Sequence, residues 1–132
     1  MRGRALLLLV SMTVSAISFG AANGAWLKKV PQADRERVNP YAGNAEAVAA
    51  GKNLFEENCA KCHGEDADGK GSRPSLKSDR IKNATDGELA WLLKNGNPYK
   101  GMPIWAGLPE QERWQIIAYV RSLNALPAEV QK

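Results

Sequence analysis

The segment Cys59-Ala60-Lys61-Cys62-His63 constrains the fold of this chain more than any other feature of its sequence. The two cysteines are the only ones among 132 residues, and His63 is the only histidine. A site built from four thiolates, or from several histidines, therefore cannot form within one chain. Any metal or redox chemistry in this segment depends on two thiols and one imidazole that are close neighbours in the sequence.

The spacing C-x-x-C-H is the signal for covalent attachment of a c-type haem. Two thiols three residues apart at the end of a helix can reach the two vinyl-derived carbons of one porphyrin, and each forms a thioether. The adjacent imidazole is then placed under the ring. A redox or structural disulfide is the alternative, but thioredoxin-like sites belong to β–α folds and no strand is predicted here. We expect one covalent haem c, attached at Cys59 and Cys62, with His63 as an axial iron ligand.

One methionine is available as the second axial ligand. Met1 and Met12 lie in an amino-terminal segment that we expect to be removed, which leaves Met102. A thioether sulfur is a known partner of histidine on haem iron. Gly101 lets the backbone approach closely, and Pro103 favours extended backbone at the residue before it. Filling a gap in the core is the alternative role, but core methionines normally lie within a helix or strand.

Further residues are candidates for the surroundings of the haem. The second ring nitrogen of a ligating histidine is commonly held by a carbonyl, and Pro74 offers one on a rigid backbone. Haem propionates need hydrogen-bond donors, and the sequence does not rank the four candidates, which are Arg73, Arg80, Trp91 and Trp105. Packing explains each tryptophan equally well.

The first 24 residues have the three-part layout of a secretory signal peptide. Two arginines precede an apolar stretch from Ala5 to Phe19, and small residues follow it. The apolar stretch is shorter than the ~20 residues that span a bilayer. We expect cleavage after Ala22 or Gly24 and export to the periplasm. Retention of the signal as a membrane anchor is the alternative.

The remaining sequence divides into a lead segment, one domain and a short tail. Residues 25–43 contain Pro31 and Pro40, which break helices, and are expected to form an extended tether or disordered arm. Residues 44–125 form the expected domain, and residues 126–132 the C-terminal tail. The net charge of +4 without a polybasic run does not suggest nucleic-acid binding.

Three or four helices and no convincing strand are predicted within the domain. The first helix runs from the N-cap Asn44 to about Asn58. Thr85 and Glu88 form a capping box that opens another helix. The last helix starts with Pro109 in its first turn.

Gly51 lies inside the first predicted helix, where glycine costs up to about 1 kcal/mol relative to alanine. A close crossing by another helix would explain it, because a residue with no side chain lets a neighbouring backbone approach. Gly96 is placed to end the helix that the capping box opens.

Together these features resemble the class I, single-haem c-type cytochromes of bacteria. The resemblance implies an all-α cytochrome c fold, with three to four helices around one covalently bound haem and the first and last helices crossing. By resemblance, Phe55 and Tyr119 lock that crossing. The matching parts are Gly51, Phe55 and Cys59, the motif at 59–63, Gly-Met-Pro at 101–103, and residues 116–120.

The resemblance implies a soluble one-electron carrier and not an enzyme. With both axial positions filled by protein, no coordination site is left for a substrate. The Asn39-Pro40 pair and the segment 101–105 are similar to small cytochromes that serve quinoprotein alcohol dehydrogenases or terminal oxidases. We expect a monomer with redox protein partners, namely a donor dehydrogenase and an acceptor oxidase or cytochrome, and with no small-molecule substrate.

Two alternative functions remain open at this point. One is an enzyme or gas-binding module with a five-coordinate haem, in which Met102 does not bind the iron. The other is a membrane-anchored electron-transfer subunit of a larger complex.

Overall fold

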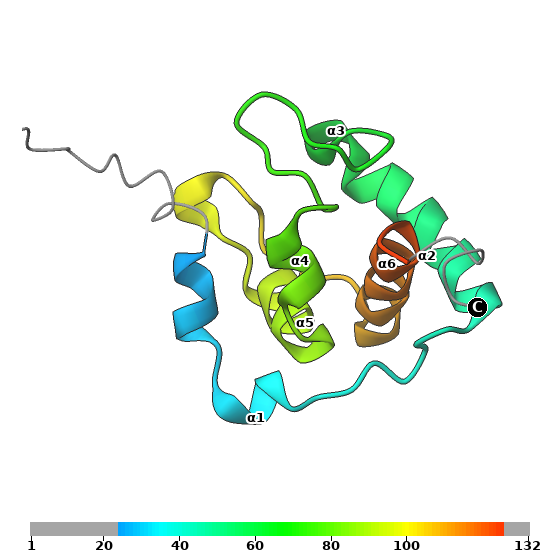
Figure 1. The fold of residues 1–132 in the computed structure, drawn as a ribbon, viewed down its shortest axis with the longest axis horizontal. Helices are drawn as coiled ribbons and strands as arrows, with labels where there is room; N and C mark the ends of the chain where they lie inside the picture. Colours follow the sequence, from blue (N-terminus) through cyan, green and yellow to red (C-terminus); the bar gives the residue numbers. More distant parts are fainter. Residues whose placement is uncertain (1–23, 126–132) are drawn as a thin grey trace, which may run out of the picture.

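Two helices from opposite ends of the domain, α2 (Ala45–Asn58) and α6 (Glu110–Leu123), pack against each other in the fold (Figure 1). The computed structural model describes residues 24–125. The predicted C-terminal tail, and all of the predicted signal peptide except Gly24, lie outside these residues. The described part contains no strand, which agrees with the all-α expectation.

Shorter helices fill the space around this pair. None of the helices within residues 24–125 has the length and apolar character needed to cross a membrane. In chain order the other elements are η1 (Ala25–Lys29), α1 (Gln32–Arg35), α3 (Ala60–His63), α4 (Asp79–Asn83), α5 (Asp86–Asn95) and η2 (Pro98–Lys100).

Local signals in the sequence set the helix ends. The side chain of Asn44 caps α2. Thr85 and Glu88 form the complete capping box at the start of α5, and Gly96 ends that helix with a φ of 63°. These predictions are confirmed. The prediction for Pro109 is wrong by one position, because this residue is the N-cap of α6 and not part of its first turn.

The crossing of α2 and α6 depends on Gly51. A Cβ atom at this position would overlap the carbonyl oxygen of Gln115 and lie 2.5 Å from its carbonyl carbon. Four residues later, the fully buried Phe55 packs on Tyr119, with ring centroids 5.3 Å apart and planes tilted by 54°. The two backbones therefore meet at the glycine, and the aromatic pair fixes the adjacent turn.

The expectation of an extended arm at residues 25–43 is wrong. This segment, called the N-terminal strap below, contains η1 and α1 and runs around the outside of the other helices (Figure 1). Trp26, Val30 and Asn39 are buried in it. Pro31 does not disrupt helix, because it is the N-cap of α1, where its missing N–H leaves no bond unmade.

The strap is held on α5 by specific contacts. The Arg35 guanidinium pairs with the Glu88 carboxylate, and the Thr85 hydroxyl donates to the Arg35 carbonyl oxygen over 2.9 Å. A Cβ atom on Gly87 would overlap the Asp34 carbonyl oxygen. The charged residues that suggested a solvated arm thus include the ones that attach it.

Gly87→Ala is expected to destabilise the protein by about 1–3 kcal/mol through overpacking between strap and helix. In an open helical position the same change would stabilise, since alanine is the better helix former. The sign of the change in the free energy of unfolding, measured with urea, therefore distinguishes a packed position from an open one. Gly107→Ala, where the added carbon meets open space, is the matched control. Equal stability of the two variants would contradict the packing described here.

Candidate functional site

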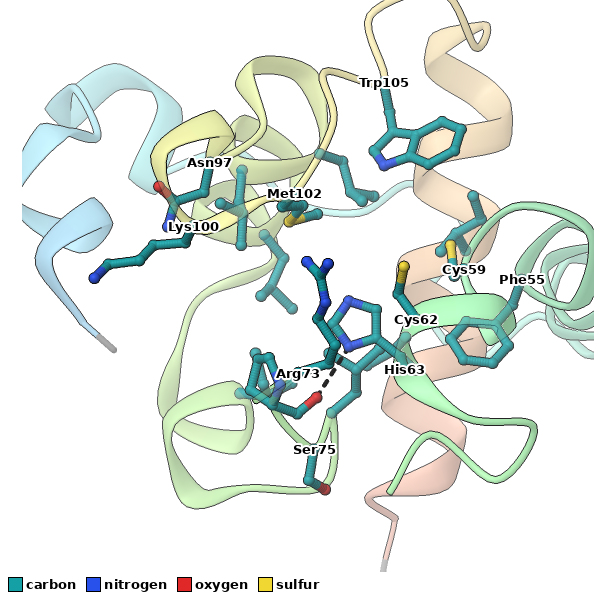
Figure 2. A pocket seen from close by; sticks show the side chains of 18 of the residues that line it. Phe55, Cys59, Cys62, His63, Arg73, Ser75, Asn97, Lys100, Met102 and Trp105 are labelled. Atoms are coloured by element: carbon teal, nitrogen blue, oxygen red, sulfur yellow. Dashed lines mark hydrogen bonds between the residues drawn. The ribbon is translucent and has the colours of Figure 1, made fainter. Parts of the chain in front are cut away.

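A cavity of about 630 Å³ opens between the helices and the loops that join them (Figure 2). Its volume lies within the range of roughly 300–1,000 Å³ typical of cofactor sites. Most of its wall is apolar, and α5 and α6 contribute three apolar side chains each. The apolar lining residues include Phe55, Leu89, Leu92, Leu93, Ile116, Ile117 and Val120.

Cys59 and Cys62 line this cavity as free thiols. Helix α2 ends at Asn58, and the short helix α3 begins directly after Cys59, so the two thiols leave the same turn region toward the cavity (Figure 2). Burial, and secondarily the neighbouring Cys62, raises the pKa of the Cys59 thiol to about 11.

His63 ends α3, and its ring projects into the cavity (Figure 2). Its Nδ1 lies 2.9 Å from the Pro74 carbonyl oxygen, so the imidazole donates there and leaves Nε2 for the cavity. Gly69, with a φ of 88°, closes the intervening loop by donating from its N–H to the His63 carbonyl over 2.7 Å. This loop sets the orientation of the imidazole.

Met102 enters the same cavity from the loop after α5. Its backbone exchanges two hydrogen bonds with Asn97, of 3.0 and 3.1 Å, which close a tight loop around η2. Gly101 supplies the left-handed turn with a φ of 80°. The backbone N–H of Trp105 donates to the Leu93 carbonyl over 2.9 Å and ties the loop to α5.

The other predicted residues take different positions. Arg73 donates from Nη1 to the Gly101 carbonyl over 3.0 Å and so links the loops that carry His63 and Met102. Arg80 and Trp105 also line the cavity. Trp91 does not line it and packs against the core instead.

Trp26 lines the cavity and was missed by the sequence analysis, because residues 25–43 were interpreted as a tether. Trp26 and Val30 are four residues apart and both buried, and this helical spacing is the signal that marks a packed segment. Ser78 also lines the cavity and had no distinguishing signal in the sequence.

The donor set fits a covalently held haem. Two thiols, one oriented imidazole and one thioether open on the same largely apolar cavity. Thiols supply thioether attachment, and an imidazole and a thioether are both established axial ligands of haem iron. The Pro74 carbonyl provides the outer hydrogen bond that a ligating histidine normally makes.

The part of the chain that forms the cavity also resembles known proteins in sequence. Residues 46–120 match the sequence model of the family described as cytochrome c oxidase, cbb3-type, subunit III. Cytochrome c-554(547) of Halothiobacillus neapolitanus is 40% identical over 94 residues, which cover 63% of this chain and 100% of that protein. Cytochrome c550 of Pseudomonas aeruginosa is 33% identical, with 64% of this chain and 61% of that protein covered.

Longer proteins match over a smaller share of their length. The cbb3-type cytochrome c oxidase subunit FixP of Rhizobium etli is 49% identical over 62 residues, covering 45% of this chain and 21% of that subunit. Among solved structures, cytochrome CL from Methylophaga aminisulfidivorans superposes with a TM-score of 0.57 and 35% identity. The match covers 64% of this chain and 58% of that one.

Proposed function

Because this chain belongs to the family described as cytochrome c oxidase, cbb3-type, subunit III, we propose that it is an exported electron carrier. We propose His63 and Met102 as its axial iron ligands. It is a class I c-type cytochrome with an all-α cytochrome c fold and one covalently bound haem c. The observation that carries the proposal is the convergence of two thiols, an imidazole and a thioether on one apolar cavity.

Each proposed residue has a distinct task. Cys59 and Cys62 hold the cofactor through thioethers, which keep it in place through repeated exchange of partners. The Pro74 carbonyl fixes the tautomer and orientation of His63. The short loop closed by Asn97 presents the Met102 sulfur. When bound, haem supplies a ferric–ferrous couple that takes up and releases one electron.

We assign no catalysis to the chain. With His63 and Met102 both on the iron, no coordination position would be left for a substrate. The apolar wall excludes water from the cofactor, and a thioether is a weak donor. Both conditions favour the reduced state and raise the reduction potential.

We also propose that the carrier moves electrons between a periplasmic donor dehydrogenase, such as one of the quinoprotein type, and a respiratory acceptor. The resemblance of the Asn39-Pro40 pair and of residues 101–105 to cytochromes that serve quinoprotein dehydrogenases supports the proposed donor. The likeness to oxidase subunits supports the proposed acceptor. The match over the whole of cytochrome c-554(547) supports a carrier that works as a single domain. We propose that it works as a monomer. Such redox encounters are transient and bury less than about 1,200 Å².

A visible spectrum of the protein, expressed with the cytochrome c maturation machinery, tests the proposal. We expect a low-spin c-type spectrum in both oxidation states and no response of the reduced protein to carbon monoxide. A high-spin spectrum that responds to carbon monoxide would instead support the five-coordinate alternative. The Cys59→Ser/Cys62→Ser double variant is the control for covalent attachment.

The amino terminus of the purified protein tests the location. We expect it near Ala25 in a periplasmic fraction. Recovery of the intact chain, residues 1–24 included, only from membranes would contradict export as a free carrier and support the anchored subunit.

A further inference from the structure

We propose that Ser78 and Arg80, covered by Trp26 of the N-terminal strap, bind a haem propionate. This inference rests on the proposed attachment of the haem at Cys59 and Cys62. It assigns one end of the cavity to a carboxylate, and it gives the strap a direct role in holding the cofactor.

The hydroxyl of Ser78 is buried beside the cavity and lacks a hydrogen-bond partner among the described residues. Ser78 is the N-cap of α4, a position where a serine side chain normally accepts a hydrogen bond from the helix backbone. Here it makes no such bond, and its Oγ is buried without a hydrogen-bond partner among the residues that the structure describes. Buried hydroxyls are normally paired. Because Ser78 lines the cavity, the missing partner is expected to come from the molecule bound there.

The guanidinium of Arg80 is a cation at the cavity whose donors are available for a ligand. Arg80 lines the cavity two residues after Ser78, and within residues 24–125 its guanidinium makes neither a hydrogen bond nor an ion pair. The other arginines in this range all donate to protein oxygens: Arg35, Arg37, Arg73, Arg113 and Arg121. Its planar fork of N–H groups matches a carboxylate in shape and charge.

The charge of the cavity wall points to the same kind of ligand. Four cationic side chains line the cavity, while no aspartate or glutamate of the described residues does. The cations are Lys61, Arg73, Arg80 and Lys100. A wall of this composition attracts anionic groups, and the propionates are the anionic groups of haem.

The attachment chemistry selects which end of the cavity the propionates reach. In a haem the two vinyl-derived carbons and the two propionates lie on opposite edges of the macrocycle. Cys59 and Cys62 flank the start of α3, whereas α4 lies away from α3, toward α1 (Figure 1). A haem attached at Cys59 and Cys62 would therefore direct its opposite edge away from α3 and Lys61, toward the part of the wall to which Ser78 and Arg80 of the α4 region belong.

Trp26 completes the site. It is only 7% exposed and packs with Ile81 and Leu89, which also line the cavity. The chain at the start of the strap also passes close to Arg80, because a Cβ atom on Gly24 would lie 3.7 Å from Arg80 Nε. A buried indole beside this position would limit access of water to the proposed ion pair and so strengthen the attraction between opposite charges. Trp26 lies outside residues 46–120, the part of the chain that matches the family.

The test compares variants of the intact holoprotein, namely Ser78→Ala, Arg80→Gln, Arg80→Lys and, as a matched control on the same helix, Lys82→Gln. Lys82 does not line the cavity. Two readouts are used: the propionate bending bands in the resonance Raman spectrum, and the pH at which the reduction potential changes as a propionate ionises. Haem content per chain, measured first, shows whether each variant matures.

We expect Arg80→Gln to move the propionate ionisation upward by about one pH unit or more, because the facing cation is lost. Arg80→Lys, which keeps the positive charge, should show little of that upward shift. Ser78→Ala should shift the Raman bands with a smaller change in ionisation, and Lys82→Gln should match the wild type.

Two results would overturn the assignment. One is that Arg80→Gln and Ser78→Ala are both indistinguishable from Lys82→Gln. The other is that Arg73→Gln or Lys100→Gln produces the shift instead, which would place the propionates at the other cationic rim. Failure of the proposed function is separate, since the wild-type protein would then lack a covalent, low-spin haem before any variant is compared.

Discussion

Gly51→Ala is expected to reduce the yield of folded holoprotein to near the limit of detection. The added Cβ would overlap the Gln115 carbonyl oxygen and lie 2.5 Å from its carbon, both of them backbone atoms that cannot rotate away. Helices α2 and α6 would have to separate, and the Phe55–Tyr119 contact would separate with them. Overpacking of a core costs about 1–3 kcal/mol and more where backbone must move. That is a large share of a total stability of about 5–15 kcal/mol.

The measurement is haem content per chain together with the midpoint of urea unfolding. Gly107→Ala is the control, since it makes the same chemical change where the new carbon has no neighbour within 4 Å. Wild-type stability of Gly51→Ala would mean that the two helices do not meet at this residue.

Met102→Ala is expected to keep the covalent haem but to open one coordination position on the iron. The reduced variant should bind carbon monoxide, and its reduction potential should fall, because a thioether ligand favours the ferrous state. Titration of the potential and a spectrum with carbon monoxide measure both effects. Ile104→Ala, an exposed position on the same loop, is the control.

The ligand assignment would be refuted by a Met102→Ala spectrum and potential that match the wild type. Loss of covalent haem in this variant would show instead that Met102 is needed for folding or maturation. In that case Met102→Leu, which keeps an apolar side chain of similar volume, separates ligation from packing.

Much of this fold could be predicted because the relevant signals are local. The capping residues Asn44, Thr85 and Glu88 act within one helical turn, so their positions in the sequence are enough to place helix starts. Gly51 could be interpreted as a crossing point because a glycine inside an otherwise helical pattern needs a reason outside that helix.

The N-terminal strap could not be predicted in the same way. Its proline and charge content is typical of a solvated arm, and the contacts that fix it join residues far apart in the chain. Asp34 meets Gly87, and the Asn39 amide donates to the Trp114 carbonyl over 2.9 Å. Such contacts have no local pattern, so only the structure shows that the segment packs.

Ser78 illustrates the same limit within the candidate site. Ser78 precedes the short helix α4, which is not among the helices predicted from the sequence, and its hydroxyl does not cap that helix. Its buried position beside the cavity became visible only once the surrounding elements were in place.

The two carboxylate oxygens of Glu88 serve different partners. Oε2 accepts from the Thr85 N–H over 2.8 Å, and Oε1 pairs with Arg35 of the strap. One side chain thus links the cap of α5 to the strap, so losing it would remove a contact from both at once. We therefore expect backbone hydrogen exchange in the strap near Arg35 and in the first turn of α5 to respond together when Glu88 is changed.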